Sequence, residues 1–123
     1  MLEAYSLNVA VSANSPIPFN SVSVAKGCSA VLVSPTTIEL NRCGVYKVDV
    51  DVSAPATNTI QLFKDGVAQS QAQSTGSSPN FSTLVQVDRN NSCCPCSSST
   101  SIQVRLVTAA TLTDANIVVT KIA

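Results

Sequence analysis

Histidine is absent from the 123 residues of this sequence, and its absence excludes a large part of ordinary enzyme chemistry. Without an imidazole there is no Ser-His pair for hydrolysis, no histidine-mediated proton shuttle and no imidazole-ligated metal. Glycine is also scarce. The four glycines stand singly at turn-like positions, so no glycine-rich loop is available to cradle a phosphate. The sequence therefore predicts a protein that is not an enzyme.

Charged residues are few and balanced, with seven basic and seven acidic side chains. The basic residues are scattered singly, which predicts no binding to nucleic acid. Near-zero net charge leaves little repulsion between apolar surfaces and favours an obligate assembly. No run approaches the roughly 18 apolar residues of a membrane span, and the N-terminus has no basic start followed by an apolar run. We therefore expect neither a membrane span nor a secretory signal.

Small and branched aliphatic residues dominate the apolar part of the composition. Hydrophobic residues make up 45% of the chain but aromatic residues only 4%, so valine, alanine, leucine and isoleucine supply the apolar mass. Such side chains suit sheets. No window shows the three- and four-residue apolar spacing of an amphipathic helix longer than two turns. Because the length is that of one domain, we predict a single all-β domain over residues 1–123.

The clearest strand is predicted at 44–52, where Tyr46 and three valines alternate with polar residues. Such alternation is typical of a strand with one buried and one wet face. The wet face carries Asp49 and Asp51, the one closely spaced carboxylate pair that could serve in acid–base catalysis. We interpret both as solvent-facing.

Further strands follow from the same period of two. At 5–11 the alternation predicts that Tyr5, Leu7, Val9 and Val11 share a buried face. A proline-interrupted stretch then leads into a kinked or edge strand through Val24. The other predicted strands are 30–33, 37–40, 59–63, 81–87, 101–107 and 116–122.

Turn signals separate these strands. Asp-Gly at 65–66 lies between β-rich flanks and predicts a tight hairpin, whereas the polar stretch 69–79 is predicted as a loop or a weakly ordered edge. In all, about eight to ten short antiparallel strands are expected, a number that fits a jelly-roll sandwich.

Five cysteines form the one unusual feature: Cys28, Cys43, Cys93, Cys94 and Cys96. One interpretation is a local staple of reduced or partly disulfide-bonded thiols. A second is a structural metal site, with thiolates of the 93–96 loop joined by Cys28 and Cys43 in tetrahedral sulfur coordination. A third is a disulfide between subunits, or a redox-active thiol. No other cofactor is expected. A simple hairpin at the break near Pro35 would set Cys28 opposite Cys43.

Four motifs in order give the chain a resemblance to a known family. The sequence resembles the trimeric jelly rolls of tumour necrosis factor and of complement globular heads from about residue 5 to residue 122. It is similar in more detail to their bacterial and bacteriophage relatives, which cap exosporium filaments or form fibre heads and capsid decorations. The motifs are Ile-Pro-Phe-Asn at 17–20, Thr-Thr-Ile-Glu-Leu at 36–40, Gly-Val-Tyr at 44–46 and Leu-Phe-Lys-Asp-Gly at 62–66.

This resemblance implies a homotrimer and a structural role. We expect a virion protein made in the host cytoplasm, a phage head decoration or fibre-type knob that reinforces a capsid or attaches to a cell. Its partners would be its own copies, the major capsid protein or the host cell surface. Val45, Phe63 and Val107 fall off the main alternation and are the candidate residues for contact between subunits.

Two alternative functions stay open. One is a bacterial surface or spore-coat domain of the same fold. The other is a carbohydrate-binding module, for which jelly rolls are common scaffolds. Sugars usually stack on aromatic rings, and the five aromatic residues here are predicted to point mostly inward.

Overall fold

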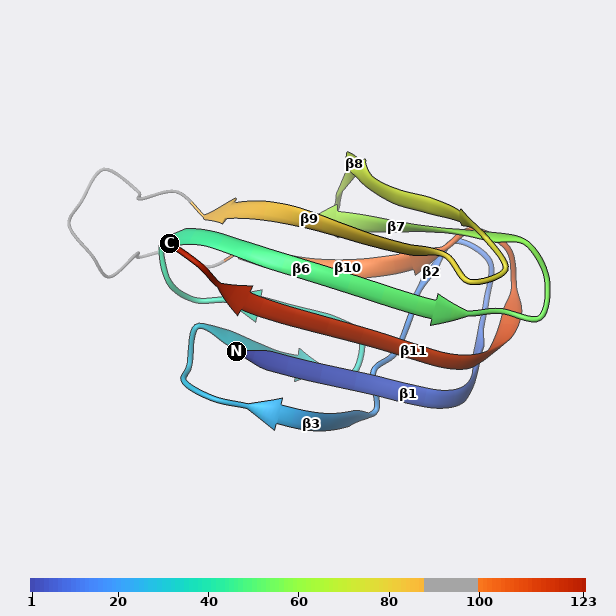
Figure 1. Ribbon diagram of the computed structural model, residues 1–123, viewed down its shortest axis with the longest axis horizontal. Helices are drawn as coiled ribbons and strands as arrows, with labels where there is room; N and C mark the ends of the chain where they lie inside the picture. Colours follow the sequence, from blue (N-terminus) through green and yellow to red (C-terminus); the bar gives the residue numbers. More distant parts are fainter. Residues whose placement is uncertain (88–99) are drawn as a thin grey trace.

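Eleven strands and no helix make up residues 1–87 and 100–123, the part of the chain that the computed structural model describes (Figure 1). No helix long and apolar enough to cross a membrane is therefore present in those residues. The strands are β1 (Leu2–Val11), β2 (Ser15–Pro16), β3 (Ser21–Ala25), β4 (Ala30–Ser34), β5 (Thr37–Leu40), β6 (Gly44–Ser53), β7 (Asn58–Lys64), β8 (Val67–Gly76), β9 (Asn80–Val87), β10 (Thr100–Leu106) and β11 (Ala110–Lys121).

Two antiparallel sheets are stacked as a sandwich. The five-stranded sheet has the order β3-β1-β11-β6-β9, and the six-stranded sheet has the order β4-β5-β10-β7-β8, with β2 paired to β10. Most strands that follow one another in sequence belong to different sheets, so the chain crosses repeatedly between the layers (Figure 1). This is the jelly-roll sandwich that the sequence predicted, and its eleven described strands are one more than the expected range of eight to ten.

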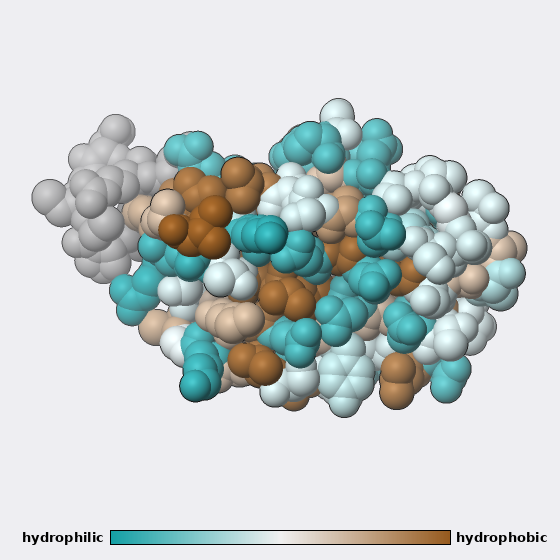
Figure 2. Space-filling view, viewed as in Figure 1, coloured by the Kyte–Doolittle hydropathy of each residue, from teal (hydrophilic) through white to brown (hydrophobic). Residues whose placement is uncertain are grey.

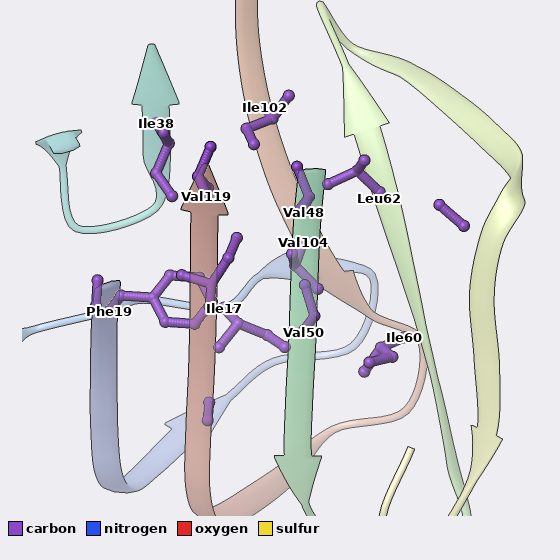
Figure 3. Close-up of a cluster of buried hydrophobic side chains, with 14 of the residues drawn as sticks. Ile17, Phe19, Ile38, Val48, Val50, Ile60, Leu62, Ile102, Val104 and Val119 are labelled. Atoms are coloured by element: carbon purple, nitrogen blue, oxygen red, sulfur yellow. The ribbon is translucent and has the colours of Figure 1, made fainter. Parts of the chain in front are cut away.

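The core lies between the sheets and is almost wholly aliphatic. Figure 3 shows valines of β6 and β11 facing isoleucine and leucine side chains of the six-stranded sheet. Burying each such side chain contributes about 1.5–3 kcal/mol to stability. The labelled core residues are Ile17, Phe19, Ile38, Val48, Val50, Ile60, Leu62, Ile102, Val104 and Val119.

The proline-interrupted segment before β3 closes part of this core. Ile17 and Phe19 are both buried. The buried hydroxyl of Ser6 holds the segment in place, because it donates to the carbonyl of Pro18 (2.7 Å) and accepts from the amide of Asn20 (2.8 Å). The Ile-Pro-Phe-Asn motif therefore fills part of the core, and its backbone is hydrogen-bonded to β1.

β1 departs from the predicted alternation. In its first half Leu2 and Ala4 face the core, so Tyr5 and Leu7 point outward. The prediction that these two are buried is wrong, and Leu7 is 65% exposed. Asn8 then adopts a φ of 51°, a left-handed conformation that asparagine tolerates. The alternation inverts there, and the last two residues of the predicted set do pack on the core.

The 65–66 hairpin is confirmed, whereas the prediction for 69–79 is half right. Asp65 and Gly66 both have positive φ, as the tightest hairpin turns require, and Lys64 pairs with Val67. The segment that follows is not a loop: β8 continues to Gly76 as a strand, although its pairing with β7 shifts register between Gln61 and Phe63. It lies at the edge of its sheet, as the second half of the prediction states. Its polar side chains are compatible with a strand because pairing uses the backbone, and at the edge of a sheet polar side chains can stay in water.

Candidate functional site

The outer face of the five-stranded sheet carries unpartnered apolar side chains. Cross-strand pairing places Val118 between Glu3 and Asp49, and it places Leu84 opposite Lys47. These residues point away from the core, because their neighbours along each strand fill it. We call this surface the outer sheet face. Its members on β6, β9 and β11 are Val45, Lys47, Asp49, Leu84, Gln86, Val118 and Thr120.

Apolar and charged side chains are interleaved on this face. Leu84 is 57% exposed, and Val45 and Val118 are half-buried. Figure 2 shows hydrophobic side chains gathered over the end of the sheet near the C-terminus, with hydrophilic ones between and beyond them. The one ion pair of the described residues, Lys47 to Asp49 at 4.0 Å, lies on this face and is well exposed. Such a pair adds little to the stability of a protomer.

The second carboxylate of the β6 pair also points outward. Asp51 is exposed, and it lies in a cross-strand row between Asn116 of β11 and Asn80 of β9. The interpretation of Asp49 and Asp51 as solvent-facing is therefore confirmed for the protomer. Among the described residues, no three Cys, Asp or Glu side chains come together in a way that could hold a metal ion.

The three residues predicted for subunit contact do not share a surface. Val45 belongs to the outer sheet face. Phe63 and Val107 lie together on the opposite layer, where both line one pocket of the six-stranded sheet. The sequence identified three side chains that are not core residues, but it could not tell that they point in opposite directions.

The two described cysteines differ in chemical state. Cys28 is a free, exposed thiol in the turn between β3 and β4, whereas Cys43, just before β6, is disulfide-bonded. A sulfur in a disulfide is not a thiolate, so this bond and the metal interpretation are alternatives for Cys43. Cys93, Cys94 and Cys96 lie outside the described residues, and the five-cysteine metal site stays a prediction.

A register shift explains why Cys28 does not lie opposite Cys43. The hairpin of β4 and β5 slips by one residue between Leu32 and Ser34. Cys28 therefore lies beside Arg42, whose Nη2 donates to its Sγ at 3.2 Å. This hydrogen bond, together with the positive charge of Arg42, lowers the pKa of the Cys28 thiol. Sequence analysis missed Arg42, because only the exact register brings it to the thiol.

Tyr46 fixes the backbone that presents Arg42. Its ring is completely buried, and its hydroxyl lies 2.8 Å from the carbonyl of Arg42, to which it donates. The same oxygen accepts from the amide of Arg42 at 3.3 Å. Burial raises the pKa of Tyr46, so the hydroxyl keeps its proton over the physiological range. The tyrosine of the Gly-Val-Tyr motif is thus a structural clamp on the turn before β6.

Replacing Arg42 by glutamine is expected to slow alkylation of Cys28. Because the thiolate is the reactive form, loss of the hydrogen bond and the charge raises the pKa of Cys28 and moves the pH–rate midpoint upward. The measurement is the rate of iodoacetamide labelling against pH, read for the Cys28 peptide by mass spectrometry. Lys26→Gln removes a charge two residues away without removing that hydrogen bond. An equal shift in both variants would contradict the specific role of Arg42.

Comparison with known proteins identifies the fold. No protein-family model matches the sequence, and no curated protein is significantly similar to it. The globular domain of zebrafish complement 1qA protein matches with a TM-score of 0.73 at 10% identity, over 99% of this chain and 96% of that one. Murine APRIL matches with a TM-score of 0.67 at 13% identity, over 98% and 97% of the two chains.

A third match comes from an insect protein. Eiger TNF from S. frugiperda has a TM-score of 0.62 at 12% identity, over 99% of this chain and 92% of that one. Identities this low establish the fold alone. The resemblance to tumour necrosis factor and complement globular heads is therefore confirmed as a likeness of fold.

Proposed function

We propose that this jelly roll is a structural building block of a virion, a head decoration or fibre-type knob, that assembles as a homotrimer through the outer sheet face. The observation that carries the assembly is the set of aliphatic side chains that this face leaves uncovered in one protomer, namely Val45, Leu84 and Val118. In a cyclic trimer each subunit would cover the outer sheet face of its neighbour. The three aliphatic side chains would then be buried away from water.

The polar members of the face are compatible with such an interface. Protein interfaces combine an apolar centre with a polar rim and about one hydrogen bond per 100–200 Å². Lys47 and Asp49 carry opposite charges beside the aliphatic residues, and Gln86 and Thr120 bring further hydrogen-bonding groups. Near-zero net charge, with seven residues of each sign, adds little repulsion between like subunits.

The virion role is supported by features that point away from other classes. The chain has no histidine, its fold is typical of non-enzymatic proteins, and its motifs resemble those of phage and exosporium heads. The proposed partners are the major capsid protein or a host cell surface, and the proposed location is the virion. A bacterial surface or spore coat is the alternative location.

Native mass spectrometry of the purified chain tests the assembly. We expect a species of three times 12.7 kDa, and we expect it to persist in reductant because the contacts are between sheets and not through sulfur. A monomer at micromolar concentration would contradict the trimer. A trimer that falls apart only in reductant would replace the sheet contact by disulfides between subunits.

Fractionation of the source culture tests the location. Peptides of this chain should co-sediment with capsid protein in a density gradient of purified particles. Peptides found instead in the cell-wall or spore-coat fraction, and absent from particles, would overturn the virion role in favour of the bacterial surface.

A further inference from the structure

A pocket of about 270 Å³ opens on the outer face of the six-stranded sheet. Strand pairing builds it: Arg105 of β10 lies opposite Gln61 of β7, and Gln103 lies opposite Phe63. The loop before β2 forms a further wall, because the amide of Asn14 donates to the carbonyl of Val107 at 3.2 Å. The lining residues are Asn14, Gln61, Phe63, Arg105, Leu106 and Val107.

Arg105 is the one charged group of this pocket, and it has no anionic partner. Its Cζ lies 4.2 Å from the centroid of the Phe63 ring, and its Nη2 donates weakly to Gln103 Oε1 at 3.4 Å. Its Nε is buried without any hydrogen-bond partner, the one such side-chain atom in the described residues. In the same residues no carboxylate lies within 4.0 Å of the guanidinium, since the only such ion pair joins Lys47 and Asp49.

A half-buried cation without a counter-ion is costly, because the charge loses hydration and gains no ion pair. Stacking on an aromatic ring offsets only part of this cost. A guanidinium held over a ring by a cation–π contact keeps its remaining donors in the planar fork that matches the two oxygens of a carboxylate. The arrangement is therefore that of an anion site whose anion comes from outside the chain.

The other walls narrow the chemistry of the ligand. Gln61 and Asn14 also line the pocket, and their side-chain amides are groups that can donate to and accept from hydroxyl groups. Gln61 Nε2 donates to the carbonyl of Gln69 at 3.3 Å, which leaves its Oε1 as an acceptor. Phe63 and Val107 contribute apolar surface. No second cation lines the pocket, so a singly charged carboxylate suits it better than a doubly charged phosphate. The volume lies just below the usual range of small-molecule sites, about 300–1,000 Å³, which suits one sugar ring.

We propose that this pocket binds a single acidic sugar, with the carboxylate on Arg105, hydroxyl groups on Gln61 and Asn14, and the ring against Phe63. The site goes beyond the proposed assembly and is independent of it. It lies on the sheet opposite the outer sheet face and shares no residue with that face. Ligand binding and trimer formation can therefore fail separately.

Calorimetric titration of the intact protein with glucuronate tests the proposal. We expect glucuronate to bind and glucose, which lacks the carboxylate, to bind at least about tenfold more weakly, because a charge-assisted hydrogen bond is lost. Arg105→Gln should lose at least about tenfold in glucuronate affinity for the same reason. Lys26→Gln, an equal change of charge on an exposed loop, should bind as the unmodified chain does. Equal losses in both variants, or equal binding of glucose, would overturn the role of Arg105.

Two further ligands separate the sources of the anion. Acetate binding as tightly as glucuronate would overturn the sugar part of the proposal, and tighter binding of glucose 6-phosphate would overturn the choice of a carboxylate. If Arg105→Gln fails to fold, an experiment on the unmodified protein still tests the role of Arg105. The Arg105 Nε–H resonance in a ¹⁵N-labelled sample should shift on glucuronate addition and stay unchanged with glucose. An unmoved resonance at saturating glucuronate would overturn the site.

Discussion

Leu84→Glu is expected to convert the trimer into folded monomers. Leu84 is 57% exposed in the protomer and lies directly opposite Lys47 on β6. In a monomer the new carboxylate faces water and Lys47, and an opposite-charge cross-strand pair contributes about 0.2–1 kcal/mol. In the trimer the same carboxylate would be buried against a neighbouring subunit, where the loss of hydration exceeds the gain from one pair. Each trimer would carry three such groups.

Sedimentation velocity measures the oligomer, and far-ultraviolet circular dichroism measures the fold. Val67→Glu is the matched control, since Val67 is 63% exposed and also lies opposite a lysine, Lys64, but on the six-stranded sheet. We expect this control to stay trimeric. A trimer that survives Leu84→Glu would remove the outer sheet face from the interface, and dissociation in the control alone would move the interface to the other sheet.

Local alternation was enough to predict most strands, because a strand with one buried face records that face in its sequence. β6 shows this best: every second residue from Tyr46 to Val52 is buried, as predicted. The alternation of apolar and polar residues gives a wrong prediction where a strand exchanges its buried and exposed faces. At Asn8 a positive φ exchanges the two faces of β1, and no rule of period two contains that inversion.

Contacts between distant segments were beyond the reach of the sequence. The pocket depends on Phe63 and Arg105, which are brought together by the pairing of β7 with β10. Phe63 was recognised as a side chain off the alternation, but not as the ring beneath a guanidinium. Three of the five aromatic residues do point inward or pack on the core, whereas Tyr5 and Phe63 point outward. A one-residue register shift was likewise needed to bring Arg42 to Cys28.

Gly44→Ala is expected to destabilise the protein by about 2–6 kcal/mol, from two separate causes. Gly44 has a φ of 142°, which side chains rarely adopt and which costs about 1–3 kcal/mol. A Cβ at this position would also collide with the carbonyl oxygen of Ala123 and crowd the side chain of Lys121. Relieving such a collision costs about 1–3 kcal/mol. That carbonyl accepts from the amide of Val45, so moving it also weakens a hydrogen bond of 3.2 Å.

Gly27→Ala separates the two causes. Gly27 also has a positive φ, 74°, but no atom lies within 4 Å of the Cβ that it would gain. This variant should therefore lose only the conformational part, about 1–2 kcal/mol for a residue in the left-handed region. Urea unfolding of both variants at one protein concentration gives the comparison, and equal losses would rule out the collision. The expected difference would show that the glycine of Gly-Val-Tyr is needed because residues 121–123 pass close to the start of β6. Tyr46, two positions further on, holds the turn that precedes the strand. The start of β6 must therefore meet two packing requirements, one at the glycine and one at the tyrosine, and this gives a physical reason for the spacing of the two residues.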